Sequence, residues 1–189
     1  MEEQGQMSHE RKEELTALLK SLSFLQKQSD RAMGVIGAAD LDEDLGDLLR
    51  TFFIDHTEFA DNLLSEHGVL GAFASRIKIA FALGLISEGE YKNLDLIREI
   101  RKKFAHRPGF EFSFETPEIK DRCLRLQTPK EVNGQFKQTG SPRDRYMTTC
   151  AFLRFAVTHH LEKTSHRVRP QSVTEEEIVS RLKEEGLVS

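Results

Sequence analysis

The chain has 189 residues, of which 31% are charged and 38% are hydrophobic, and its formal net charge is -4. This composition is typical of one folded domain, and it excludes disordered and collagen-like chains. The negative net charge argues against a protein coated with cations for general DNA binding, so we expect any nucleic-acid contact to be local.

The sequence predicts a cytoplasmic protein without membrane contact. Its N-terminal residues are acidic and polar, unlike a secretory signal, and no apolar run is long enough for a membrane span. Cys123 and Cys150 match no metal-ligand spacing, so we expect two buried, reduced thiols. His159 and His160 are adjacent and diverge on a helix, which makes them poor metal ligands. We expect no metal and no cofactor.

Three parts are expected in chain order. They are an N-terminal helix within residues 1–28, a helical bundle domain over 29–163, and a hinge with a short C-terminal helix over 164–189. A leucine stripe at helical spacing predicts that the first helix covers about residues 9–27. The stripe consists of Leu15, Leu18, Leu19, Leu22 and Leu25.

The bundle domain is expected to begin with one long helix. Its apolar positions keep a single helical phase up to Phe53, and Ser29 or Asp30 is a suitable N-cap. Gly34 and Gly37 each cost about 1 kcal/mol in a helix interior, but the continuous phase outweighs this cost.

The next apolar segment, over residues 72–86, is apolar nearly all round, which predicts a helix at the centre of the bundle. Ser87 and Glu90 form a capping box that opens a further helix, and a Pro-Gly pair ends it. Alternating phenylalanines over 110–114 predict either a short strand or hairpin arm, or an extended connector with anchored rings.

Two more helices are predicted at about 117–126 and 142–163, separated by a turn-rich surface loop. Sustained alternation of period two is nearly absent from the chain. The sequence therefore predicts an all-α, up-and-down bundle of about five to seven helices.

Helix 87–106 ends in a basic cluster within "LIREIRKKFAHRPG". Arg101 falls on the inward-facing stripe, so we expect it to pair with a carboxylate. The candidates, assigned to the preceding long helix, are Asp47, Asp55, Glu58 and Asp61. His106 lies five residues further on, about 140° around an ideal helix, so the two side chains meet only if the helix tightens or ends between them.

The cluster has two chemical interpretations. A histidine and an arginine in one cleft could cleave a phosphodiester, with His106 moving the proton and Arg101 holding the phosphate. The surrounding cations could instead contact nucleic-acid phosphates, or complement the negative end of the helix dipole. These cations are Arg98, Lys102, Lys103 and Arg107.

The segment "GVLGAFASRIKIAFALGLISEGEYKNLDLIREIRKKFAH" resembles the central block of the mannitol operon repressor family. The likeness covers about residues 30–126 and is strongest from Gly68 to Ile86. It implies a self-associating, all-helical bundle that represses sugar-alcohol utilisation genes without a recognisable DNA-binding motif. We therefore expect a non-enzymatic transcriptional regulator, a homodimer that acts through protein partners or through an indirect nucleic-acid contact.

The segment "RKKFAH" also resembles the Arg-x4-His motif of HEPN domains, helical bundles that dimerise and in many members cleave RNA. The likeness extends to Arg101 and His106 only. In those ribonucleases a polar Asn, Asp or His commonly follows the arginine, whereas this chain has Lys102. The alternative function is therefore a metal-independent ribonuclease, or a component of a toxin system.

Overall fold

The structure, a computed structural model, describes residues 22–106, 112–127 and 140–169, together with Thr16, Lys20, Ser180, Arg181 and Glu184. Every regular element in these ranges is a helix, which confirms the predicted all-α class. Residues 22–26 are helical and precede the labelled helices. The labelled helices are α2 (Asp30–Phe52), α3 (Thr57–Leu64), α4 (Phe73–Ala82), α5 (Glu88–His106), α6 (Pro117–Arg125) and α7 (Pro142–Lys163).

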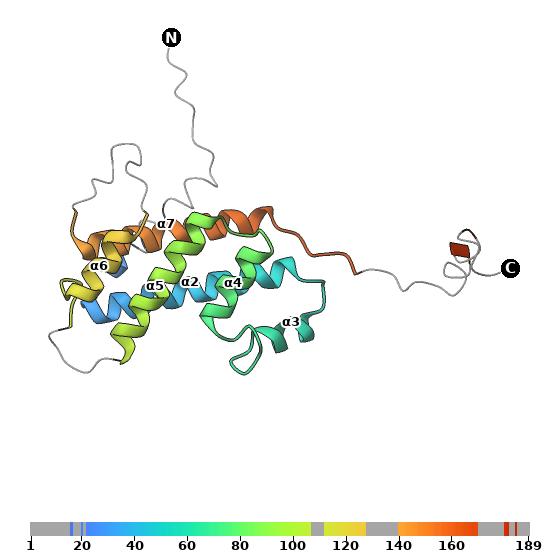
Figure 1. Cartoon of the computed structure of the whole chain (residues 1–189), viewed down its shortest axis with the longest axis horizontal. Helices are drawn as coiled ribbons and strands as arrows, with labels where there is room; N and C mark the ends of the chain where they lie inside the picture. Colours follow the sequence, from blue (N-terminus) through green and yellow to red (C-terminus); the bar gives the residue numbers. More distant parts are fainter. Residues whose placement is uncertain are drawn as a thin grey trace, which may run out of the picture.

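Helix α2 forms the centre of the bundle. It is one continuous helix, as predicted, and Ser29 caps it by accepting a hydrogen bond from the Ala32 amide at 3.3 Å. Helix α7 runs alongside α2, and α5 crosses the pair (Figure 1). The leucines of α2 that face these neighbours are fully buried, and they are Leu41, Leu45, Leu48 and Leu49. Their burial supplies much of the apolar area that stabilises the fold.

The glycines inside α2 allow neighbouring helices to approach closely. A Cβ at Gly34 would lie 2.3 Å from the ring of Phe104 in α5, and one at Gly37 would lie 3.2 Å from Sγ of Cys150 in α7. The Tyr146 hydroxyl of α7 also donates to the Gly34 carbonyl at 2.9 Å. The cost of glycine in a helix is therefore offset by close packing on two sides.

Helices α3 and α4 differ from the sequence prediction. The sequence did not suggest α3, which is short and buries only Ala60 and Leu64. Helix α4 ends at Ala82, because Gly84 adopts a left-handed φ of 71°. The expectation that α4 lies at the centre was wrong. It packs on one side of α2 and α5, and Phe81 and Leu83 are exposed on its outer end.

The connector before α6 uses its phenylalanines as anchors. The Phe112 and Phe114 rings pack on Phe104 with centroid distances of 5.2 and 4.9 Å, and Phe114 also contacts Tyr146. Residues 112–114 form no strand, so the extended-connector alternative describes this part of the segment. The remaining residues of the predicted arm, 110 and 111, lie outside the described ranges.

After α7, residues 164–169 return to the C-terminal end of α2. The His166 ring donates through Nδ1 to the Phe53 carbonyl at 2.7 Å, and the Arg167 amide donates to the Phe52 carbonyl at 3.1 Å. The Arg167 guanidinium lies 4.7 Å from the centre of the Phe52 ring. The start of the predicted C-terminal hinge is thus attached to the bundle. In the described ranges, none of the helices is long and apolar enough to cross a membrane.

Candidate functional site at the end of α5

Arg101 is held by a carboxylate of α2. Its Nη1 lies 3.2 Å from Oδ2 of Asp42, while Oδ1 of the same carboxylate accepts from Nη1 of Arg76 in α4 at 2.9 Å. The Asp42 side chain is only 18% exposed, so two arginines from two helices share one largely buried carboxylate. Two cations around one anion offset the cost of removing that charge from water.

The ion pair expected for Arg101 therefore exists, but its predicted partners were wrong. Asp47 is exposed, Asp55 and Glu58 follow the end of α2, and Asp61 of α3 pairs with Arg50. The apolar pattern of α5 shows which way Arg101 faces, but it does not reveal where α5 crosses α2. The crossing places Asp42 opposite Arg101.

His106 is the last residue of α5, and it is exposed. The helix continues without a break from Arg101 to His106, so the two side chains point about 140° apart around its axis. The tightening or ending that would bring them together is not seen between these residues. The structure thus places Arg101 against Asp42 and His106 toward solvent.

Two of the three neighbouring cations in the described ranges, Arg98 and Lys103, have carboxylate partners. Arg98 donates to Oδ1 of Asp95 through Nε and Nη2, at 2.9 and 2.7 Å. Lys103 donates to Oε2 of Glu118 in α6 at 2.8 Å. Lys102 is exposed on the outer face of the helix. The fourth predicted phosphate contact, Arg107, lies outside the described residues.

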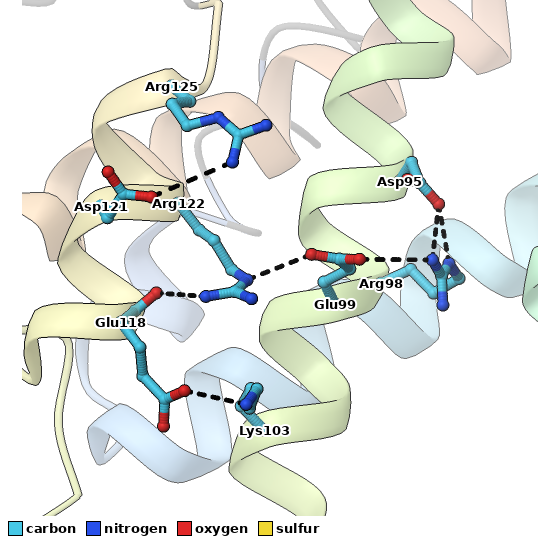
Figure 2. Close-up of polar contacts among 8 residues, drawn as sticks. All are labelled: Asp95, Arg98, Glu99, Lys103, Glu118, Asp121, Arg122 and Arg125. Carbon is cyan, nitrogen blue, oxygen red and sulfur yellow. Dashed lines mark hydrogen bonds and ion pairs between the residues drawn. The ribbon is translucent and has the colours of Figure 1, made fainter.

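Helix α6 contributes the other half of a charged network, which we call the α5–α6 charged face (Figure 2). Arg122 joins the helices, because its Nε donates to Oε2 of Glu99 at 3.1 Å and its Nη1 to the Glu118 carbonyl at 2.6 Å. Arg125 pairs with Asp121 at 3.9 Å. The face carries four acidic and four basic side chains. It consists of Asp95, Arg98, Glu99, Lys103, Glu118, Asp121, Arg122 and Arg125.

This balance of charge limits the attraction of the face for polyanions. A phosphate at Arg98, Lys103 or Arg122 would compete with carboxylates that already hold these cations. Each pair is partly exposed and contributes about 1 kcal/mol or less to folding. The sequence spacing of Asp95 and Arg98 could have revealed one pair, whereas the contacts between α5 and α6 needed the fold.

The residues that carry the family resemblance form a tight turn around Arg76. A Cβ at Gly68 would lie 2.3 Å from the carbonyl oxygens of Asn62 and Leu63, and one at Gly71 would lie 2.3 Å from that of Ser65. Only residues without a side chain fit this turn against the end of α3. The Gly-x-Leu-Gly motif is therefore a packing requirement.

Arg76 completes this turn by satisfying backbone carbonyls. Its Nε donates to Leu70 at 2.8 Å, its Nη2 to Leu64 at 2.8 Å, and its Nη1 to the carbonyl of Asp42 at 2.9 Å. The side chain is only 15% exposed. The sequence pattern indicates no chemistry for Arg76, and the structure gives it an architectural role.

The two adjacent histidines of α7, His159 and His160, also contact neighbouring side chains. Nε2 of His160 lies 3.0 Å from Oε1 of Glu90, and the His159 ring stacks on Phe155. Burial alone would raise the pKa of Glu90, but hydrogen bonds from Ser87 and His160 outweigh it and leave that pKa lowered. In the described part of the chain, no three His, Cys, Asp or Glu side chains are grouped to hold a metal ion.

Both cysteines are buried free thiols, as expected. Burial raises the pKa of the Cys123 thiol to about 12, and burial also raises that of Cys150. A thiol protonated at neutral pH is a poor nucleophile, so neither cysteine is activated for chemistry.

A family model described as mannitol repressor matches residues 35–158, a range from α2 to near the end of α7. This chain belongs to the mannitol repressor family. The match confirms the resemblance seen in the sequence around the Gly-x-Leu-Gly turn.

A solved structure shares the fold of this mannitol repressor family member. It is the X-ray structure of the MtlR-HPr complex from Escherichia coli, aligned with a TM-score of 0.54 and 22% sequence identity. The alignment covers 78% of this chain and 98% of that chain. No match was found among curated proteins.

Proposed function

We propose that this chain is a transcriptional regulator that acts by binding a protein partner, without catalysis and without a DNA-reading helix of its own. The observation that carries the proposal is the mannitol repressor match over residues 35–158, which includes nearly the whole bundle. The sequence shows no convincing helix-turn-helix, since the helix pair with a tight glycine-containing connection, α4 and α5, begins its second helix with acidic residues, Glu88 and Glu90.

Two further observations support a protein partner. The described arginines at the end of α5 already have carboxylate partners, which leaves the α5–α6 charged face close to neutral. In addition, a protein of the same fold was crystallised in complex with HPr. HPr is therefore the partner to test first, and we propose that a homodimer of this chain binds it.

The direct test is calorimetric titration of the full-length chain with purified Escherichia coli HPr. A DNA duplex containing a mannitol operon promoter serves as the competing ligand. We expect saturable binding of HPr, and no retention of the duplex by the chain alone at physiological salt. Sedimentation should give twice the chain mass of 21.6 kDa. Tight DNA binding together with no HPr binding would overturn the proposal.

A matched pair of charge reversals tests the basic cluster directly. Lys102→Glu changes an exposed cation of α5, and Lys78→Glu makes the same change on α4. If binding is mediated by protein, neither variant should retain the duplex at physiological salt, and any weak retention at low salt should fall equally in both, through net charge alone. A larger loss in Lys102→Glu, with a reduced dependence on salt, would assign a nucleic-acid contact to the end of α5.

The ribonuclease alternative is tested by incubating the chain with structured RNA in the presence of a chelator. His106→Ala is compared with His159→Ala, because both replace an exposed histidine on a helix. We expect no cleavage by either variant or by the unchanged chain, since Arg101 is engaged by Asp42. Cleavage that only His106→Ala removes would establish the enzyme.

A further inference from the structure

The α4–α5 pair exposes apolar side chains at the turn that joins the two helices. Phe81 and Leu83, at the end of α4, are 41% and 37% exposed. The Phe81 ring stacks on Tyr91, near the start of α5, with a centroid distance of 4.8 Å. The two helices lie side by side (Figure 1). An apolar patch therefore faces solvent where α4 meets α5.

Cations continue the same side of both helices. Tyr91, Arg98 and Lys102 follow one another at intervals of seven and four residues, so they form one stripe along α5. On α4, the exposed Lys78 lies three residues before Phe81. The eleven residues from Tyr91 to Lys102 rise about 17 Å along the helix. We call this surface the α4–α5 outer face. It consists of Lys78, Phe81, Leu83, Tyr91, Arg98 and Lys102.

The α4–α5 outer face carries excess positive charge, although the net charge of the whole chain is -4. Helix α4 contains no Asp or Glu. Lys78 and Lys102 form no ion pair with the residues that the structure describes. Asp42 is shared by two arginines, so that group keeps one positive charge, and its Arg101, next to Lys102, is 35% exposed. These cations leave the face attractive to carboxylates.

We propose that the α4–α5 outer face binds an acidic segment of a partner protein, whose carboxylates meet the two lysines and whose apolar side chains pack on Phe81. Opposite charges steer such a segment to the face, and burial of the exposed apolar patch holds it there. The pair between Asp95 and Arg98 stays intact between the two ends. The inference rests on the proposed function, because it assumes a protein partner, but that partner need not be HPr.

Two other occupants match the face less well. A nucleic acid would supply phosphates but no aliphatic group for Leu83, and one side of the Phe81 ring is already stacked on Tyr91, which limits base stacking. A second copy related by a two-fold axis would set the same cations against one another. Charge complementarity therefore favours an acidic protein segment.

The test is fluorescence anisotropy of the full-length chain with a labelled synthetic peptide rich in Glu and Leu. A helical peptide of about twelve residues spans about 18 Å, which matches the face. The matched probe has Gln in place of every Glu. We expect the Glu peptide to bind at least about tenfold more tightly than the Gln peptide, and its affinity to fall as salt is added.

Two pairs of variants locate the contact on the chain. Lys78→Glu combined with Lys102→Glu should weaken binding of the Glu peptide by about tenfold or more. The control changes two exposed lysines outside α4 and α5, Lys20→Glu with Lys27→Glu, and should have a much smaller effect. Phe81→Ser should also weaken binding.

The control for Phe81→Ser is Phe59→Ser, which replaces a 53% exposed ring on α3 and should leave binding unchanged. Circular dichroism checks that each variant stays folded. No binding of the Glu peptide, equal binding of the two peptides, or equal effects of the two lysine pairs would refute the proposal.

The remaining outcomes separate the other occupants. A single-stranded DNA of equal charge that binds more tightly than the Glu peptide would assign the face to nucleic acid and overturn the proposal. A change from dimer to monomer in Phe81→Ser would assign it to a second copy, with the same consequence. HPr binding without peptide binding would refute this face and leave the proposed function intact. Peptide binding without HPr binding would support the face and reject HPr as the partner.

Discussion

A single arginine, Arg76, and the arginines of the α5–α6 charged face stabilise this protein in different ways. Arg76 is 15% exposed, and its guanidinium donates hydrogen bonds to three backbone carbonyls and one carboxylate. Arg98 and Arg122, on the α5–α6 charged face, are 28% and 23% exposed and pair mainly with partly exposed side-chain carboxylates. The sequence draws attention to the second group because its cations are clustered. The structure shows that the isolated arginine makes the stronger set of contacts.

The largest effect on stability is expected from a substitution at Arg76. We expect Arg76→Ala to lower the free energy of unfolding by about 3 kcal/mol, because Asp42 loses a cation and the carbonyls of Leu64 and Leu70 lose their donor. Urea unfolding followed by circular dichroism measures the change. Arg122→Ala is the control, and an equal loss of stability in the two variants would contradict the stronger role of Arg76.

The glycine turn around Arg76 should be nearly as sensitive. Gly71→Ala places a Cβ 2.3 Å from the Ser65 carbonyl, and relief of that overlap should cost about 2 kcal/mol. Gly89→Ala is the matched control, because its Cβ would meet only the end of the Gln127 side chain at 3.5 Å. Thermal melts should show a lower midpoint temperature for Gly71→Ala and no lowering of the midpoint for Gly89→Ala. A neutral Gly71→Ala would mean that the turn can rearrange.

Glu90 is an intermediate case, with a side chain 17% exposed, and its contribution should depend on pH. Because its folded pKa is below the ordinary value of 4.5, its contribution is present above that pH and is lost as the pH falls through the folded pKa. Glu90→Gln should therefore be about 1 kcal/mol less stable at pH 7. That difference should vanish in acid. Urea titrations across this range would measure it, and a constant difference would refute the assignment.

The smallest effect is expected on the α5–α6 charged face. Arg122→Gln should cost less than about 1 kcal/mol, since its pair with Glu99 is partly exposed. The loss should shrink further in high salt, which screens such pairs. Unfolding at two salt concentrations measures both effects. A loss as large as that of Arg76→Ala would mean that Arg76 and the arginines of the α5–α6 charged face contribute equally to stability.

The sequence predicted the elements whose signals are local. The phase of apolar residues defined α2, the Ser87 and Glu90 capping box opened α5, and both features appear in the structure. Helix α3 was missed because eight residues carry too little periodic signal. Helix α4 was placed at the centre because its exposed Phe81 cannot be told from a core residue by pattern alone.

The candidate site was predicted less well, because its contacts join distant segments. The need of Arg101 for a carboxylate followed from its position on α5, but the identity of Asp42 depended on how two helices cross. Arg76 stands alone in the sequence, and its partners come from a turn and from α2. The roles of Arg98, Lys102, Lys103, Arg107 and His106 in binding or catalysis remain predictions for the experiments above.

The return of residues 164–169 to the end of α2 matters for anyone who shortens or tags this protein. A chain cut after Lys163 would lose two hydrogen bonds at this end of α2, from Arg167 to the Phe52 carbonyl and from His166 to the Phe53 carbonyl. Expression designs should therefore keep every residue through Arg169 and place an affinity tag beyond it, so that the last turn of the central helix stays closed.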